Sequence, residues 1–338
     1  MLNSFFVNAA VSNGMQALKW LYWFFGICMQ GLLTLFNNQY FAALVVFTII
    51  TRLVLFPLNL RQQKTLAKTT RLQPKIQKIQ KKYANTNDPR DRQKMNEEMQ
   101  ALYAREGHNP MSMGCGPMIF QMIFLMGVIG IIYYPIQYLI GVKLDNEVSN
   151  AIVASLSDIQ AQLGVDTGRR YYFQLDLIQH FKEYKDVLIT EYGNLFTDDK
   201  VAAIEEYQRN MMIGKIDMSQ TPHWKDGIIV IVPILCLVSS LASSVMSTFI
   251  QKKTNPAAAA QQGQMLMMML MMPFVSFWFS FQVPAAVGFY WIVSNIVAIV
   301  QQAVMAKFFP PKRNMARSMI EGTIERRSRE ESIKKIKD

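Results

Sequence analysis

Five long apolar blocks constrain this chain more than any other feature of its sequence. A helix needs about 20 residues, at about 1.5 Å per residue, to cross roughly 30 Å of hydrocarbon, and each block approaches that length. A soluble domain would instead spread its apolar residues along one face of each helix or strand. The sequence therefore predicts an all-α, polytopic membrane protein with a five-helix transmembrane core. The spans are expected at 40–59, 117–142, 227–250, 264–281 and 285–307.

The charges between the blocks indicate how the chain is oriented in a membrane. Residues 61–110 carry 12 Lys and Arg against 5 Asp and Glu, and residues 307–338 carry 10 against 5. The connection 251–263 adds two lysines, whereas residues 143–226 carry 9 basic and 14 acidic side chains. Because positively charged loops stay in the cytoplasm, we expect the acidic segment 143–226 outside and the basic segments inside. The N-terminus would then lie outside and the C-terminus inside.

Residues 15–36, within the N-terminal segment 1–39, fit three interpretations. They can form a helix in the outer membrane interface, a sixth span, or the core of a signal peptide. A signal peptide would have a basic region before the apolar run and a small-x-small cleavage site after it, and the sequence has neither. A sixth span would leave only three residues to connect it to the next one. The aromatic cluster suits the headgroup level, so we favour the interfacial helix and keep the other two interpretations open.

One arginine lies inside an apolar block. Arg52, in YFAALVVFTIITRLVLFPLN, is about 12 residues, or about 18 Å, from the outer end of its span. A charge at mid-membrane costs roughly 2.5–3.5 kcal/mol, so it usually faces a polar cavity or a partner. Alternatively, the long side chain reaches the cytoplasmic headgroups, about 10 Å away. The five blocks contain no Asp or Glu that could pair with Arg52, which favours a water-filled cavity.

The basic segment 60–110 has helical periodicity. Two apolar stripes at spacings of three and four residues flank a turn-rich stretch. They consist of Leu72, Ile76, Ile79 and Tyr83, and of Met95, Met99 and Leu102. Two amphipathic helices joined by a short turn predict an antiparallel hairpin in the cytoplasm. The hairpin either fixes the topology through its charge alone, or receives substrates near anionic headgroups or ribosomal RNA.

No catalytic or metal-binding pattern occurs in the sequence. Cys28, Cys115 and Cys236 lie far apart, in or beside apolar stretches and without a CxxC motif. We interpret them as small buried side chains rather than disulfides or ligands. The three histidines are equally dispersed, and the sequence has no Walker loop, HExxH motif or nucleophile elbow. It therefore predicts no metal, no cofactor and no enzymatic activity.

Four motifs, in this order, resemble one known family. They are TRLVLFPLNLRQQ, LQPKIQKIQKKY, QALYAREGHNPMSMGCGPMIFQM and PAAVGFYWIVSNIVAIVQQ. They are similar to the YidC family of membrane protein insertases, over about residues 40–142 and 227–308. The large periplasmic β domain of Gram-negative members has no counterpart in the sequence, so the chain resembles the shorter Gram-positive type. Residues 143–226 are longer than expected for that type, and the resemblance gives them no role.

The resemblance implies both a fold and a function. Members of the family have five core helices around a hydrophilic groove that opens to the cytosol and to lipid. They insert and fold membrane proteins in the bacterial plasma membrane, alone or beside the Sec translocon. The groove arginine of the family aligns with Arg52, which implies that Arg52 faces the groove rather than the headgroups.

Other polar side chains of the spans would keep such a groove wet. The candidates are Gln121, Ser294, Asn295, Gln301 and Gln302. Ser294 and Gln301 are seven residues apart, as are Asn295 and Gln302, so each pair shares a helix face. Alternatively, these residues make ordinary hydrogen bonds between helices.

The implied partners are nascent membrane proteins and the lipid bilayer, and DNA is not expected. The Sec translocon and the ribosome are further candidates, the latter through the hairpin and the basic tail 308–338. The tail has few apolar residues, so we expect it to be disordered when free. Two other classes stay open. One is a channel or small-solute transporter, in which internal repeats are common, although none is found here. The other is a regulator that binds partners through the hairpin.

The acidic segment 143–226 is predicted to be a small helical domain. Thr197 or Asp198 is expected to cap a helix over 199–212. Val201, Ile204 and Tyr207 would then lie on one side of that helix, facing the interior of the domain.

Overall fold

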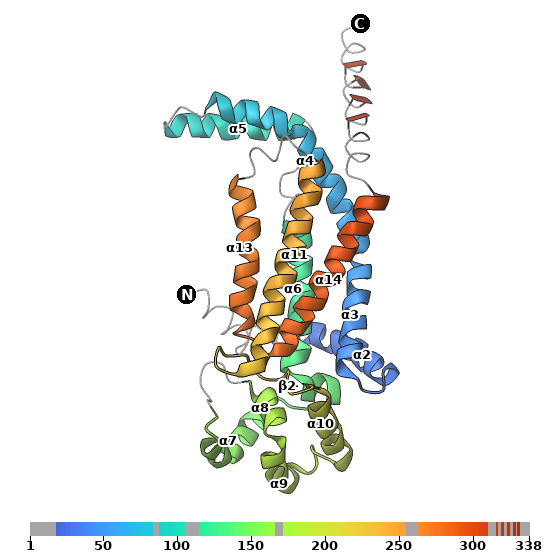
Figure 1. The fold of residues 1–338 in the computed structure, drawn as a ribbon, viewed down its shortest axis with the longest axis vertical. Coiled ribbons are helices and arrows are strands. Elements are labelled where there is room, and N and C mark those ends of the chain that lie inside the picture. Colours follow the sequence, from blue (N-terminus) through green and yellow to red (C-terminus); the bar gives the residue numbers. More distant parts are fainter. Residues whose placement is uncertain are drawn as a thin grey trace. The chain divides into compact units, whose positions relative to one another are not determined.

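The computed structural model describes residues 18–83, 88–105, 115–165, 172–254 and 263–309, with isolated positions between 316 and 331. The described residues are almost entirely helical, which confirms the predicted fold class (Figure 1). The chain divides into two compact units. The first consists of Met1–Thr51, Ile123–Ser240 and Pro273–Asn295, and the second of Arg52–Met122, Leu241–Met272 and Ile296–Asp338.

The first two described helices of the chain are joined by a sharp turn. Helix α2 (Lys19–Leu35) and helix α3 (Tyr40–Val54) are connected through Asn37 and Asn38, whose φ angles are 51° and 60°. Asparagine tolerates this left-handed conformation better than most residues, so the chain can change direction within a few positions.

Helix α2 has one buried side and one exposed apolar side. Phe25 packs edge-on against Phe47 of α3 and Phe124 of α6 (Cys115–Tyr133), with ring centroids 5.3 and 5.4 Å apart. On the other side, Trp20 and Trp23 are 64% and 62% exposed. Residues 15–17 lie outside the described residues, and the interfacial position of this helix stays a prediction.

Helix α6 is followed by a short π-helix, η3 (Ile136–Ile140), which packs against α2. A β-carbon on Gly26 would lie 2.7 Å from the carbonyl oxygen of Tyr138, so only glycine permits this approach. Gln30 Nε2 donates to the carbonyl oxygens of Tyr138 and Leu139, both at 3.0 Å. The π-helix is therefore held to α2 by backbone contact and by side-chain hydrogen bonds.

Residues 143–226 are called the insert below, and their described part, 143–165 and 172–226, forms four helices and a small hairpin of strands. These are α7 (Asn146–Leu163), α8 (Phe173–Gln179), α9 (Phe181–Tyr192), α10 (Asp198–Asn210), β1 (Met212–Ile213) and β2 (Ile216–Asp217). The strands are antiparallel, and the left-handed Gly214 (φ 62°) lies in the turn between them. The sequence did not predict this hairpin.

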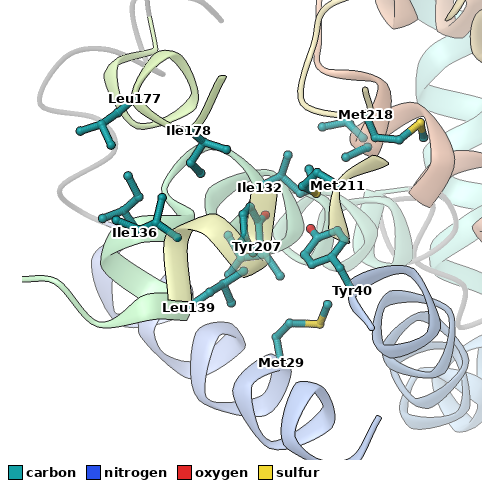
Figure 2. Packing of buried hydrophobic residues seen from close by; sticks show 14 of the residues in the cluster. Met29, Tyr40, Ile132, Ile136, Leu139, Leu177, Ile178, Tyr207, Met211 and Met218 are labelled. Atoms are coloured by element: carbon teal, nitrogen blue, oxygen red, sulfur yellow. The ribbon is translucent and has the colours of Figure 1, made fainter. Parts of the chain in front are cut away.

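The helix predicted over 199–212 is present as α10, and Val201, Ile204 and Tyr207 are buried as expected. The predicted side-chain cap is wrong. Thr197 occupies the N-cap position but makes no capping hydrogen bond, and Asp198 is already helical. Figure 2 shows Tyr207 and Met211 of the insert packed among Tyr40, Ile132 and other apolar side chains of the first unit. The helix α10 is therefore stabilised by burial of its apolar side in this shared core rather than by a side-chain cap.

The remaining apolar blocks are helical as well. A 3-10 turn, η4 (Gly227–Val230), leads into α11 (Ile231–Thr254), and α13 (Gly263–Ser280) and α14 (Ala285–Phe308) follow. Among the described residues, Gly227–Ile250 and Ala285–Phe308 are long and apolar enough to cross a membrane. Shorter apolar helices occupy Tyr40–Val54, Ile123–Tyr133 and Met271–Ser280. That all five blocks cross stays a prediction.

The basic segment between the first two blocks forms a helical hairpin. Helix α4 (Phe56–Lys82) packs against α5 (Pro89–Arg105), and Figure 1 shows the two side by side. Lys82 pairs with Glu98, and the Tyr83 hydroxyl donates to the same carboxylate at 2.9 Å. These hydrogen bonds hold the pKa of Glu98 below its ordinary value. Leu72 and Ile76 of the predicted stripe are buried, whereas no side chain of α5 is.

The described positions of the tail, between 316 and 331, have helical backbone. The predicted disorder is therefore wrong at these positions. Their side chains are exposed, and Thr323 Oγ1 donates to the Met319 carbonyl oxygen at 2.9 Å.

Candidate functional site

Arg52 lies in the last turn of α3, next to two threonines. Thr48 is fully buried, and its hydroxyl donates to the Leu44 carbonyl oxygen at 2.7 Å. Thr51 Oγ1 donates to the Thr48 carbonyl oxygen at 2.9 Å. Residues four apart lie on the same side of a helix, so Arg52 shares a side of α3 with Thr48. The helix thus carries a short polar stripe within an otherwise apolar sequence.

The other side of α3 has a different chemistry. Ile49, Ile50 and Leu53 are 38%, 45% and 64% exposed, a surface that suits lipid tails. Arg52 is half-buried and borders this apolar surface, because it lies three residues after Ile49 and next to Leu53. A cation inside an apolar segment is normally directed toward the protein interior or a wet cavity. That Arg52 faces such a cavity stays a prediction.

Asn295, one of the predicted groove residues, connects two helices. Its Nδ2 donates to Ser239 Oγ at 3.1 Å and to Ser240 Oγ at 2.9 Å, both on α11. This is the interhelical hydrogen bonding that the sequence left open as the alternative. Ser239 and Ser240 did not enter the predicted site, although the paired serines in LCLVSSLASS were a visible signal.

Helices α11 and α14 also approach closely nearer to their N-terminal ends, one turn before Ser239 and two turns before Asn295. Cys236 is fully buried and donates to the Gly288 carbonyl oxygen at 3.2 Å. A β-carbon on Gly288 would lie 2.8 Å from Val232 Cγ1. Cys236 is thus a small buried residue as predicted, while Cys28 is half-buried and the side chain of Cys115 lies outside the described residues.

The two glutamines near the other end of α14 are different from Asn295. Gln301 Nε2 and Gln302 Oε1 are buried, and neither has a hydrogen-bond partner among the described residues. A buried amide atom without a partner is costly, so such atoms normally bond to water or to a ligand. The exposed residues Ile296, Val300 and Val304 form an apolar row on α14, and Gln301 borders this row because it lies three residues before Val304. That the two glutamines face a groove stays a prediction.

The remaining predicted site residues are only partly described. Ser294 is buried on α14, with 3% of its surface exposed. Gln121 lies on α6, but its side chain is outside the described residues. The structure thus brings Asn295 to two serines of α11. That Arg52, Gln121 and the polar residues of α14 line one groove stays a prediction.

Within the described part of the chain, no group of three or more His, Cys, Asp and Glu side chains is arranged to hold a metal ion. The polar residues of the spans are amides, hydroxyls and one guanidinium. These groups donate and accept hydrogen bonds, and Arg52 adds a positive charge that favours an anionic ligand.

These features define the class as a multi-pass, helical membrane protein with polar side chains within its apolar helices. The chain matches the family model described as "60Kd inner membrane protein" over residues 32–313. It therefore belongs to this family, the YidC family, as its motifs predicted.

Its relatives include membrane protein insertases of Gram-positive bacteria. "Membrane protein insertase YidC 1" of Listeria monocytogenes is 41% identical over 93 residues, 28% of this chain and 32% of the relative. "Membrane protein insertase MisCB" of Bacillus subtilis is 32% identical over 117 residues, 33% of this chain and 41% of the relative. The matched parts thus span about a third of the length of these relatives.

Proposed function

We propose that this protein inserts other proteins into a bacterial plasma membrane, moving their short polar tails through a hydrophilic groove and releasing their apolar helices into lipid. The observation that carries the proposal is Arg52, a half-buried cation beside Thr48 and Thr51 on an otherwise apolar helix. An unsatisfied backbone group in hydrocarbon costs several kcal/mol, so a client tail needs a polar path. Arg52 would transiently hold an acidic residue of that tail.

One further observation supports a wet path. The buried amide atoms of Gln301 and Gln302 offer one donor and one acceptor without a partner among the described residues. Water or the backbone of a client can supply that partner. Asn295 is engaged with Ser239 and Ser240, so its role in the proposal is to hold α11 and α14 together.

The proposal includes a topology and partners. The insert lies outside, the basic hairpin α4–α5 and the tail lie in the cytoplasm, and the chain is N-out and C-in across five spans. The hairpin carries the excess of Lys and Arg and a sparse apolar interface, so it is suited to receive clients near anionic headgroups. The Sec translocon is a partner for larger clients, and the ribosome is a partner through phosphate contacts of the hairpin and the tail. The proposal requires no cofactor and no enzymatic step.

Site-specific crosslinking tests the proposal. A photoreactive residue replaces the half-buried Thr51, next to Arg52, in one variant and the exposed, apolar Leu53 in another, so both variants keep Arg52. Ribosome-bound clients of increasing length are presented to both. Position 51 should crosslink to the polar tail of the client, whereas position 53 should crosslink to lipid or to the apolar helix of the client. A client that never crosslinks to position 51, with the variant present at normal abundance, would refute the groove mechanism. Crosslinks of position 51 to a small anion probe alone would instead favour a channel.

A further inference from the structure

The insert holds the turn between α2 and α3. Asn210 Nδ2, at the end of α10, donates to the Asn38 carbonyl oxygen at 2.7 Å, and Asn38 Nδ2 donates to Glu206 at 3.0 Å. One turn away, the rings of Tyr40 and Tyr207 meet edge-on at 5.4 Å, and both side chains are buried. The left-handed conformation of Asn38 is therefore fixed from outside its own helices.

The insert also holds the π-helix η3 at the end of α6. A π-helix ends with carbonyl groups that have no partner within the helix. Lys200 Nζ of α10 donates to the Ile140 carbonyl oxygen, and the amide nitrogen of Gln137 donates to Gln174 Oε1 of α8 at 3.1 Å. From α2, Gln30 Nε2 donates to the Tyr138 carbonyl oxygen, so the π-helix is hydrogen-bonded to the insert and to α2.

The third helix end held by the insert is the start of α14. The amide nitrogens of Ala285 and Ala286 donate to the carbonyl oxygens of Gln220 and Met218, at 2.9 and 2.8 Å. The first amides of a helix have no partner within it, and these two residues are at most 1% exposed. The segment 218–220 thus caps α14 with backbone carbonyls in a place where solvent has no access.

We propose that the insert is an internal clasp, which fixes the ends of α3, α6 and α14 relative to one another and stays closed while a client is inserted. Lys200 and Asn210 are its positioning residues. The contacts come from separate elements of the insert, and Tyr207, Met211 and Met218 belong to the same buried core as Met29, Tyr40 and Ile132 (Figure 2). If the insert moved like a gate during insertion, these contacts would have to break, and breaking them would expose the apolar core that the insert shares with α2, α3 and α6. Exposing a packed core is costly, so we expect the contacts to persist. That the clasp stays closed while a client is inserted rests on the proposed function.

A reversible covalent lock tests whether the clasp stays closed. Cysteines replace Gln220 and Ala285 in a chain whose Cys28, Cys115 and Cys236 are changed to alanine. The backbone hydrogen bond between these positions places their α-carbons within disulfide range. Insertion of a single-span client should be the same, within twofold, for the oxidised chain and for the same chain after reduction. Loss of insertion on oxidation and its recovery on reduction would show that the clasp must open, and would overturn the proposal.

A second experiment does not depend on insertion activity. Hydrogen–deuterium exchange is measured at the amides of residues 140–144 in the full chain, with Lys200 changed to methionine or to arginine. Lys200→Met should raise exchange at these amides at least fivefold, and Lys200→Arg should keep it near the wild-type rate, because arginine can still donate to the Ile140 carbonyl oxygen. Equal exchange in wild type and Lys200→Met would refute the clasp. If the reduced lock variant and the wild type both fail to insert clients, the proposed function fails, and the exchange result still decides on the clasp.

Discussion

At the scale of single residues, substitutions of Arg52 test the proposed mechanism most directly. It is half-buried, lies one helical turn after the buried Thr48, and borders the exposed surface of Ile49, Ile50 and Leu53. The desolvation cost of a cation in an apolar segment is large, so the surroundings of Arg52 must offer compensating polar groups or water. A side chain held in this way can bind a carboxylate briefly and release it.

Arg52→Ala should therefore reduce insertion of single-span clients with acidic translocated tails by tenfold or more. Arg52→Lys should retain part of the activity, because in a wet cavity the charge contributes more than the planar fork of the guanidinium. The measurement is protease protection of the client tail in membranes that contain equal amounts of each variant. Clients with neutral tails serve as the control and should depend less on Arg52. Equal insertion of acidic clients by wild type and Arg52→Ala would show that Arg52 does not act by binding client carboxylates.

Asn295 allows a second prediction at this scale. Its amide donates to Ser239 and Ser240, and such bonds between helices in a membrane contribute about 0.6 to 1.7 kcal/mol. Asn295→Ala should lower the free energy of unfolding in mixed detergent micelles by an amount of that order. The same substitution should cost much less in a chain that already carries Ser239→Ala and Ser240→Ala. Identical costs in the two backgrounds would mean that the bond between α11 and α14 does not contribute.

At the scale of elements, apolar length predicted the helices well, and local pattern predicted packing only in part. Each apolar block contains a helix, and the spacing of Val201, Ile204 and Tyr207 predicted a helix with a buried side. The hydrogen-bond partners could not be predicted from the sequence, because the bonds join distant positions, such as Asn38 and Asn210, that only the fold brings together. The two-residue strands β1 and β2 are too short for any alternation to be visible.

The candidate site was predicted less completely than the helices for a similar physical reason. A polar residue in a span either lines a cavity or bonds to a neighbouring helix, and its own sequence context is the same in both cases. The motif resemblance supplied Arg52, whereas the partners of Asn295 required the structure. Thr48, also missed, is recognisable only once its side chain is known to be buried on the same side of the helix as Arg52.

The insert permits a prediction about pH at the element scale. Lys185 of α9 and Glu205 of α10 pair at 2.7 Å, and the hydrogen bond from Lys185 holds the pKa of Glu205 below its usual value of 4.5. A lowered carboxyl pKa adds stability above 4.5, and this stability is lost as the pH falls through the lower value of the folded state. Lys185→Met should therefore lower the thermal midpoint of the insert slightly at pH 7 and not at pH 2. Circular dichroism of the full chain in detergent measures both. A difference of the same size at the two pH values would contradict this ion-pair contribution.

At the scale of the whole molecule, the proposed function depends on the side of the membrane on which each segment lies. The insert carries more acidic than basic residues and the hairpin more basic than acidic ones, which predicts that they lie on opposite sides of the membrane. Asp198 of the insert and Lys78 of the hairpin are both exposed and serve as reporters. In chains without the native cysteines, Asp198→Cys should react with an impermeant maleimide in intact cells, and Lys78→Cys only after the membrane is opened. Labelling of both positions in intact cells would overturn the five-span topology.

The central claim is that this chain itself places client proteins in a bilayer, and the purified chain in liposomes tests it most directly. A single-span client with a short acidic tail is synthesised in the presence of liposomes that contain the wild-type chain, Arg52→Ala, or no protein. Protection of the client tail from added protease is measured in all three. We expect several-fold more protected tail with the wild type than in empty liposomes, and a value near that of empty liposomes with Arg52→Ala. Protection that is equal in all three preparations, with the chain shown to be folded and embedded, would contradict the central claim.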